Sequence, residues 1–106
     1  MPPAPDAAAA FAQVVAALAR EPGVTEGTGF GSNPGLRAGG AIVAMLVRDA
    51  LVVKLPADRC AALIASGDAE PFRVGQRAMR EWTSMRTVDL AGWLALAREA
   101  LAFAAR

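Results

Sequence analysis

The stretch AIVAMLVRDALVVKLP, residues 41–56, decides the fold of this chain. Residues 41–47 and 51–55 are apolar and rich in β-branched side chains, which is typical of strands. Arg48-Asp49-Ala50 predicts a tight turn between them, so the two strands form an antiparallel hairpin. Because both faces of the hairpin are apolar, we expect it at the centre of a sheet. Helices should cover one face, and loops or a second subunit should cover the other.

The residues before this hairpin predict one helix and one weak strand. Asp6 is a suitable N-cap for a helix that runs to about Arg20, and Pro22-Gly23 should end that helix. Residues 24–30 predict a weak strand. Residues 31–40 are rich in Gly, Asn and Pro, which predicts a loop or an irregular hairpin.

The residues after the hairpin predict a second helix over residues 56–67, with proline in its first position and glycine at its end. Residues 72–74 and 80–88 predict two further strands, and Asp89 caps a last helix to about Ala105. The predicted order is α-β-β-β-α-β-β-α. Mostly antiparallel connections indicate an α+β fold, a two-layer sandwich with helices packed on one face of the sheet.

We expect residues 1–106 to form a single domain, because the length is typical of one domain and no linker interrupts it. Residues 1–5 are rich in proline, and we expect them to be disordered. The N-terminal region has no basic segment typical of a signal peptide, and its apolar stretch is too short to span a membrane. A cytoplasmic protein is therefore expected.

The composition excludes several kinds of chemistry within one chain. There is no histidine, which excludes Ser-His-Asp and Cys-His catalysis. One cysteine and no histidine also exclude a His/Cys zinc site and an internal disulfide. The net charge is +1, which gives no general argument for nucleic acid or an anionic membrane. We predict no cofactor, no metal and no catalytic residue, and we do not expect direct nucleic-acid binding.

Four arginines near the C-terminal strands form a candidate surface. Glu81 is the one acidic residue among residues 73–86, so the sequence predicts a local positive patch. Such a patch suits an anion, an acidic partner or nucleic acid. The competing interpretation is a solvated surface with pairing to Glu70, Glu81 or Asp68. The four residues are Arg73, Arg77, Arg80 and Arg86.

A second candidate site is a pocket between the sheet and the helices. Its predicted residues are Phe30, Lys54, Met79 and Trp82. Lys54 has the simpler interpretation of a strand-end lysine whose stem covers apolar surface. Trp82 and Met79 have the simpler interpretation of core residues. The glycine-rich residues 27–32 do not match a phosphate-binding loop, because Ser32 stands in the third glycine position and a strand follows.

The ordered set of conserved-looking pieces resembles the TfoX N-terminal domain family over about residues 10–105. The matching residues are Phe30-Gly31-Ser32, Gly35-Leu36, Gly40, Ala44-Met45-Leu46, Val53-Lys54-Leu55-Pro56, Gly67, Pro71-Phe72, Gly75, Met79 and Glu81-Trp82. In that family a lysine and a phenylalanine commonly follow the glycine at Gly40, where this chain has Ala41 and Val43. The family is similar in architecture to YjbR/MmcQ-like proteins and to secretion-chaperone-like folds.

The resemblance implies the helix and strand order given above and a regulatory role without a reaction. It also implies a protein partner, such as a transcription factor or a polymerase component. We therefore predict a non-enzymatic interaction or regulatory domain that is able to form a homodimer through its sheet. The alternative is a small-ligand (anion) binding protein or an unrecognised enzyme, with its pocket between the sheet and the helices.

Overall fold

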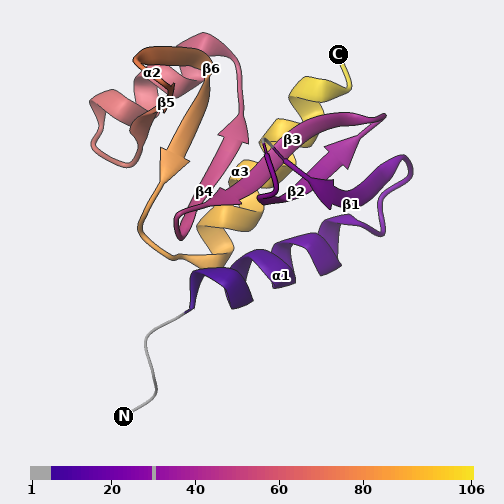
Figure 1. Ribbon diagram of the computed structural model, residues 1–106. Coiled ribbons are helices and arrows are strands. Elements are labelled where there is room, and N and C mark those ends of the chain that lie inside the picture. Colours follow the sequence, from indigo (N-terminus) through magenta and orange to yellow (C-terminus); the bar gives the residue numbers. More distant parts are fainter. Residues whose placement is uncertain (1–5, 30) are drawn as a thin grey trace.

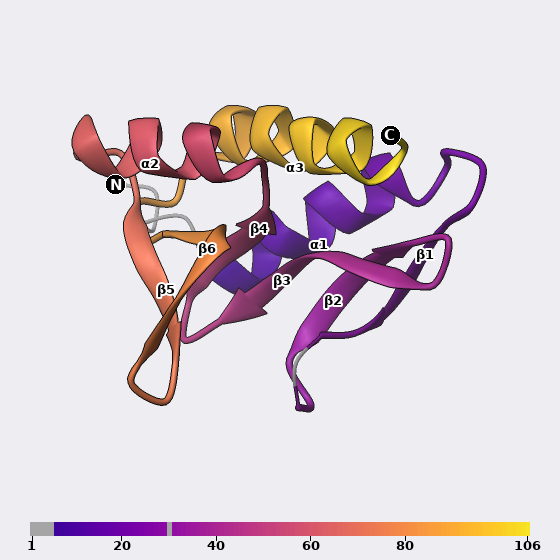
Figure 2. The ribbon, with the colours of Figure 1, turned by 90° about the horizontal axis from the view of Figure 1, so that it is seen from above.

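Three helices lie together on one face of an antiparallel sheet, so the fold is α+β with two layers, as predicted (Figures 1 and 2). The computed structural model describes residues 6–29 and 31–106. Within them the order of elements is α1 (Ala7–Leu18), β1 (Val24–Thr28), β2 (Pro34–Ala38), β3 (Ala41–Val47), β4 (Ala50–Lys54), α2 (Ala57–Ala65), β5 (Glu70–Val74), β6 (Arg77–Met85) and α3 (Leu90–Ala104). The disorder predicted for residues 1–5 lies outside the described residues.

The hairpin of β3 and β4 occupies the centre of the sheet, which confirms its predicted place. The strand order is β1-β2-β3-β4-β6-β5, and every neighbouring pair is antiparallel. Val47 pairs with Ala50 across the turn. Arg48 and Asp49 form that turn with φ values of 49° and 65°, which suits a two-residue connection between twisted strands.

Strand β2 is not predicted by the sequence pattern. Residues 31–40 were predicted as a loop or irregular hairpin, but β2 forms within them and pairs with both β1 and β3. The local composition disfavours a strand, whereas two partner strands and the burial of Leu36 favour it. Gly35 permits the close approach, because a Cβ there would lie 2.7 Å from the backbone nitrogen of Gly29. The observed order is therefore α-β-β-β-β-α-β-β-α.

Several predicted boundaries are also corrected. Helix α1 ends at Leu18, and the last two strands begin earlier than residues 72 and 80. Pairing between β5 and β6 explains their earlier start, because each strand satisfies the backbone groups of the other, and β6 also ends earlier than predicted, at Met85. Asp6 caps α1 as predicted, since its side chain accepts a hydrogen bond from Ala8 N at 3.0 Å. Asp89 occupies the cap position of α3 but makes no such bond.

The main core lies between the helices and the sheet. Its largest fully buried side chain is Trp93, whose indole Nε1 donates to the carbonyl of Thr87 at 3.0 Å. The face of β6 that turns toward this core carries Thr83, which is fully buried and donates through Oγ1 to the carbonyl of Glu70. Arg59 and Glu99 join α2 to α3 on the surface through two hydrogen bonds.

A second, smaller apolar cluster lies on the opposite face of the sheet, and we call it the outer cluster. Its buried members are Met45, Val52 and Trp82, and Ile42, Val47, Phe72 and Met79 pack against them. The hairpins β1–β2 and β5–β6 extend away from α2 and α3 (Figure 2). Trp82 belongs to the outer cluster, whereas Met85 packs against the main core. The two residues therefore lie on opposite faces of β6, as the alternation of a strand requires.

Candidate functional site

Three of the four residues predicted for a pocket lie together in the structure. Lys54 pairs with Trp82 across β4 and β6, and both line a cavity of about 470 Å³ with Met79. We call it the Lys54 cavity. Its lining residues are Lys54, Arg77, Ala78, Met79, Arg80, Glu81 and Trp82. The fourth predicted residue, Phe30, lies outside the described residues.

The position of this cavity differs from the prediction. The expected pocket lay between the sheet and the helices, but every residue that lines the Lys54 cavity belongs to β4 or β6. Strand alternation explains the difference. Lys54 is two residues from Val52, so its side chain shares the outer face with Val52 rather than the helix-covered face.

A second cavity of about 430 Å³ lies on the same outer face, and we call it the Arg73 cavity. Val47, Val52 and Phe72 of the outer cluster contribute to its lining. The four arginines of the predicted patch therefore line two different cavities. Arg77 and Arg80 belong to the Lys54 cavity, whereas Arg73 and Arg86 line this second one.

Basic side chains gather around these two cavities. Six cations line them, namely Arg48, Lys54, Arg73, Arg77, Arg80 and Arg86, against the two acids Glu70 and Glu81. The chain has 11 cations and 10 acids, so these linings carry a balance of +4 and the rest of the chain carries −3. Asp49 lies in the same turn as Arg48 without lining either cavity. The small net charge thus conceals a strong asymmetry.

Only one of these six cations forms an ion pair among the described residues. Arg86 Nε lies 3.2 Å from Glu70 Oε2, which matches one of the pairings considered from sequence. The two side chains are 77% and 57% exposed, so the pair contributes little to stability. Arg73, Arg77 and Arg80 are exposed, and no ion pair within the described part of the chain involves them.

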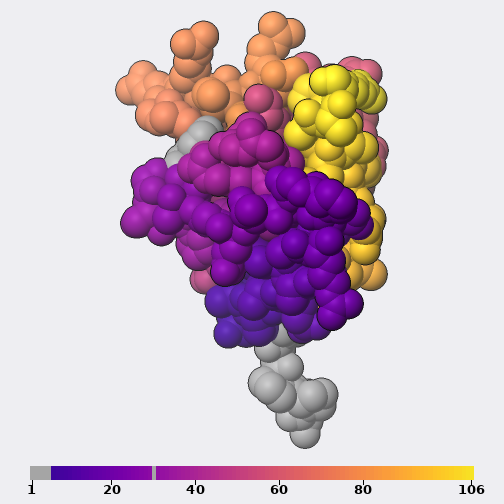
Figure 3. Space-filling view, turned by 90° about the vertical axis from the view of Figure 1, so that its right-hand side faces the viewer, coloured from indigo at the N-terminus to yellow at the C-terminus, as the bar shows by residue number. Residues whose placement is uncertain are grey.

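The β5–β6 hairpin carries these three arginines away from the body of the molecule. In Figure 3 it forms the orange projections at the top, with long side chains that extend into solvent. Arg73 pairs in register with Ala78, and Val74 pairs with Arg77, so the two strands place their basic residues near the hairpin end. The surroundings are aqueous, and binding there would depend on charge and salt.

The aromatic residues of this face are packing residues. Trp82 is 7% exposed, and its ring centroid lies 6.5 Å from that of Phe72 with the planes tilted by 54°. A protein that stacks nucleic-acid bases needs accessible rings beside its cations. The buried indole therefore does not favour base stacking at this face.

The other reactive groups have structural surroundings. Cys60 is buried on α2, and burial raises the pKa of its thiol, which the Sγ contact with the carbonyl of Leu55 at 3.7 Å opposes. This agrees with an unreactive core thiol. Asp68 accepts a hydrogen bond from Ser66 Oγ at 2.8 Å. Across residues 6–29 and 31–106, no three Asp, Glu or Cys side chains gather as a metal site would require.

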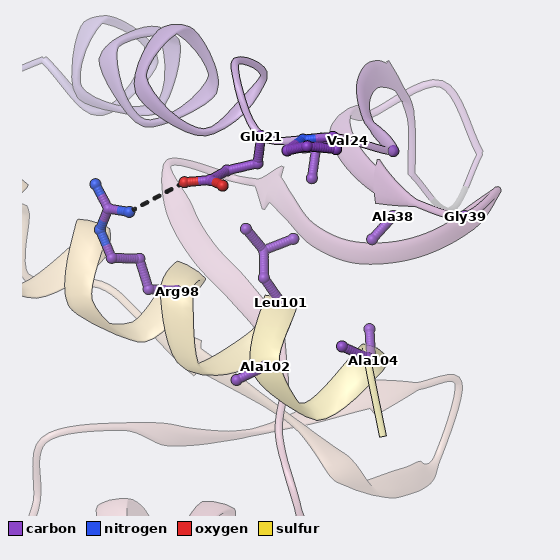
Figure 4. Close-up of a pocket in the computed structure, with 11 residues that line it drawn as sticks. Glu21, Val24, Ala38, Gly39, Arg98, Leu101, Ala102 and Ala104 are labelled. Carbon is purple, nitrogen blue, oxygen red and sulfur yellow. Dashed lines mark ion pairs between the residues drawn. The ribbon is translucent and has the colours of Figure 1, made fainter.

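Another cavity, of about 520 Å³, is separate from the outer face. It lies between the C-terminal half of α3 and the connection around β1 and β2 (Figure 4). Val24, Ala38 and Leu101 give it an apolar lining, and the ion pair of Glu21 with Arg98 at 3.8 Å lies at one side. A further cavity of about 250 Å³ between the sheet and α3 shares Lys54 with the Lys54 cavity.

Comparison with known proteins identifies no relative: no family model, no curated protein and no solved structure matches this chain. The resemblance to TfoX N-terminal domains thus remains an expectation from sequence. Among the described residues, none of the helices combines the length and apolar character needed to cross a membrane.

Proposed function

We propose that this chain is a non-enzymatic interaction domain that binds a protein partner through the outer face of its sheet. The observation that carries the proposal is the gathering of six cations against two acids around the Lys54 and Arg73 cavities. Exposed arginines attract acidic groups and form directional hydrogen bonds with carboxylates.

A regulatory, cytoplasmic setting is part of the proposal and rests on the sequence resemblance to TfoX N-terminal domains. By that resemblance the partner is a transcription factor or a polymerase component. The homodimer stays a prediction. The apolar residues on both faces of the central strands motivate it. On the outer face, Met45, Val52 and Trp82 are buried within one chain, so their burial does not require a second copy.

The test is affinity capture from the source cells with the wild-type chain and two double variants. Arg77→Ala with Arg80→Ala removes two cations of the Lys54 cavity. Arg20→Ala with Arg106→Ala removes the same charge elsewhere on the surface. We expect a partner, identified by mass spectrometry, to be captured by the wild type and the control variant and lost from the first variant.

Capture of the same proteins by all three chains would contradict the proposal. One observation favours the alternative of a small-anion binding protein: Lys54, Arg77 and Arg80 all line one cavity. If calorimetry detects saturable binding of inorganic phosphate that Arg77→Ala with Arg80→Ala abolishes, while no protein is captured, this alternative replaces the interaction domain. The alternative of an unrecognised enzyme stays a prediction from sequence.

A further inference from the structure

The two outer-face cavities adjoin each other and extend to opposite ends of one strand. Ala50, the first residue of β4, lines the Arg73 cavity, and Lys54, its last residue, lines the Lys54 cavity. A strand rises about 3.3 Å per residue, so the two positions are about 13 Å apart. Val52 lies between them and lines the Arg73 cavity, whereas Trp82 pairs with Lys54 and lines the Lys54 cavity, so the two linings meet at the outer cluster.

Each cavity has the same balance of charge. Arg48, Arg73 and Arg86 surround Glu70 in one of them. In the other, three cations surround a single acid, and these are Lys54, Arg77, Arg80 and Glu81. Each therefore has an excess of two positive charges, and a ligand that complements the whole face must carry negative charge at two places.

We infer that the outer face binds an extended acidic segment of a partner protein, with one carboxylate at each cavity. This inference rests on the proposed function and specifies the partner's chemistry. An extended chain covers about 13 Å in four residues, and residues four apart point to the same side of it. The segment should therefore carry acidic residues at positions i and i+4, with small or apolar residues between them over the outer cluster.

An extended peptide fits this face better than the other anionic ligands. A small anion does not span the roughly 13 Å from Ala50 to Lys54, the far ends of the two linings along β4. Single-stranded nucleic acid could reach both, but it gains much of its affinity from stacking on open aromatic rings. Trp82 is buried here and cannot provide that contact without rearrangement.

The inference is tested by fluorescence anisotropy with three labelled peptides. The first has glutamates at i and i+4 between Thr, Val and Ser residues. The second has the same composition with adjacent glutamates, and the third has glutamine in place of glutamate. We expect the first peptide to bind the wild-type chain most tightly, and its affinity to fall when salt rises from about 0.05 M to about 0.5 M.

Variants at both cavities separate two-site binding from general attraction. Arg77→Ala with Arg80→Ala should weaken the first peptide at least about tenfold, because the carboxylate at this cavity would lose both of its arginine partners. Arg48→Ala with Arg73→Ala should weaken it similarly. Arg20→Ala with Arg106→Ala should leave its affinity within about twofold. Circular dichroism confirms that each variant is folded.

Equal binding of the first two peptides would overturn the inference, as would equal effects of all three variants. Tighter binding of an oligonucleotide with the same charge would assign the face to nucleic acid instead. If a cellular protein is captured in an arginine-dependent manner but no acidic peptide binds, the proposed function stands and this inference fails. If capture is also absent, both fail.

Discussion

Gly29 lies close to Met45 of the outer cluster, and the absence of a side chain permits this approach. An added Cβ would lie 2.8 Å from both Cβ and Sδ of Met45. We predict that Gly29→Ala lowers the free energy of unfolding by about 1–3 kcal/mol, since overpacking forces side chains from their preferred rotamers. Urea unfolding followed by circular dichroism measures this loss.

Gly27→Ala is the matched control. Its added Cβ would meet Cδ and Nε of Arg37 at 3.2 Å, and a small shift of that side chain relieves the contact while its hydrogen bonds to the carbonyls of Gly40 and Thr28 are kept. The control should change the free energy of unfolding by less than about 1 kcal/mol. Equal losses in both variants would mean that contact with Met45 does not limit the substitution.

At the scale of single residues, the sequence predicts part of the candidate site. Lys54, Met79 and Trp82 were predicted together and line one cavity. Arg48 was missed, because its position beside Arg73 depends on how β4, β6 and β5 pair. The sequence predicts that Arg48 lies in a hairpin turn, but it does not predict which strands lie near that turn.

At the scale of elements, the helix caps allow a paired prediction. Asp6 accepts a hydrogen bond from the backbone of α1, whereas Asp89 makes no capping bond to α3. Asp6→Ala should therefore cost about 1 kcal/mol of unfolding free energy. Asp89→Ala should cost clearly less, because only its interaction with the helix dipole is lost.

Thermal and urea unfolding of the two variants measure these costs under the same conditions. A larger loss for Asp89→Ala would show that its carboxylate has a structural role other than capping. Helix content from circular dichroism shows whether either change shortens its helix.

Strand β2 illustrates the limit of sequence reasoning about elements. The central hairpin was predictable because its own residues are apolar and β-branched. Residues 34–38 lack that pattern. They form a strand because they pair with β1 on one side and with β3 on the other. Helices and the hairpin follow from local signals, whereas an irregular strand follows from its partners.

At the scale of the whole molecule, the separation of charge predicts its behaviour on an ion exchanger. At pH 8, near the calculated isoelectric point of 8.0, the chain has almost no net charge. We nevertheless expect retention on a sulfonate column, because the outer-face cavities carry an excess of positive charge. The salt concentration at elution measures the effect.

The two double arginine variants again provide the comparison, since both lose two positive charges. Arg77→Ala with Arg80→Ala should elute at lower salt than Arg20→Ala with Arg106→Ala. Elution of both at the same salt concentration would show that retention follows total charge and not its distribution.

Strand β5 forms one margin of the sheet, and its structure restricts how anything can attach there. Pro71 has no N–H to donate, and the register shifts between Pro71 and Arg73. Both features hinder the addition of another strand. A ligand beside this edge must then be recognised through side chains. Prolines in that ligand would not weaken binding, because its backbone N–H groups would not pair with β5.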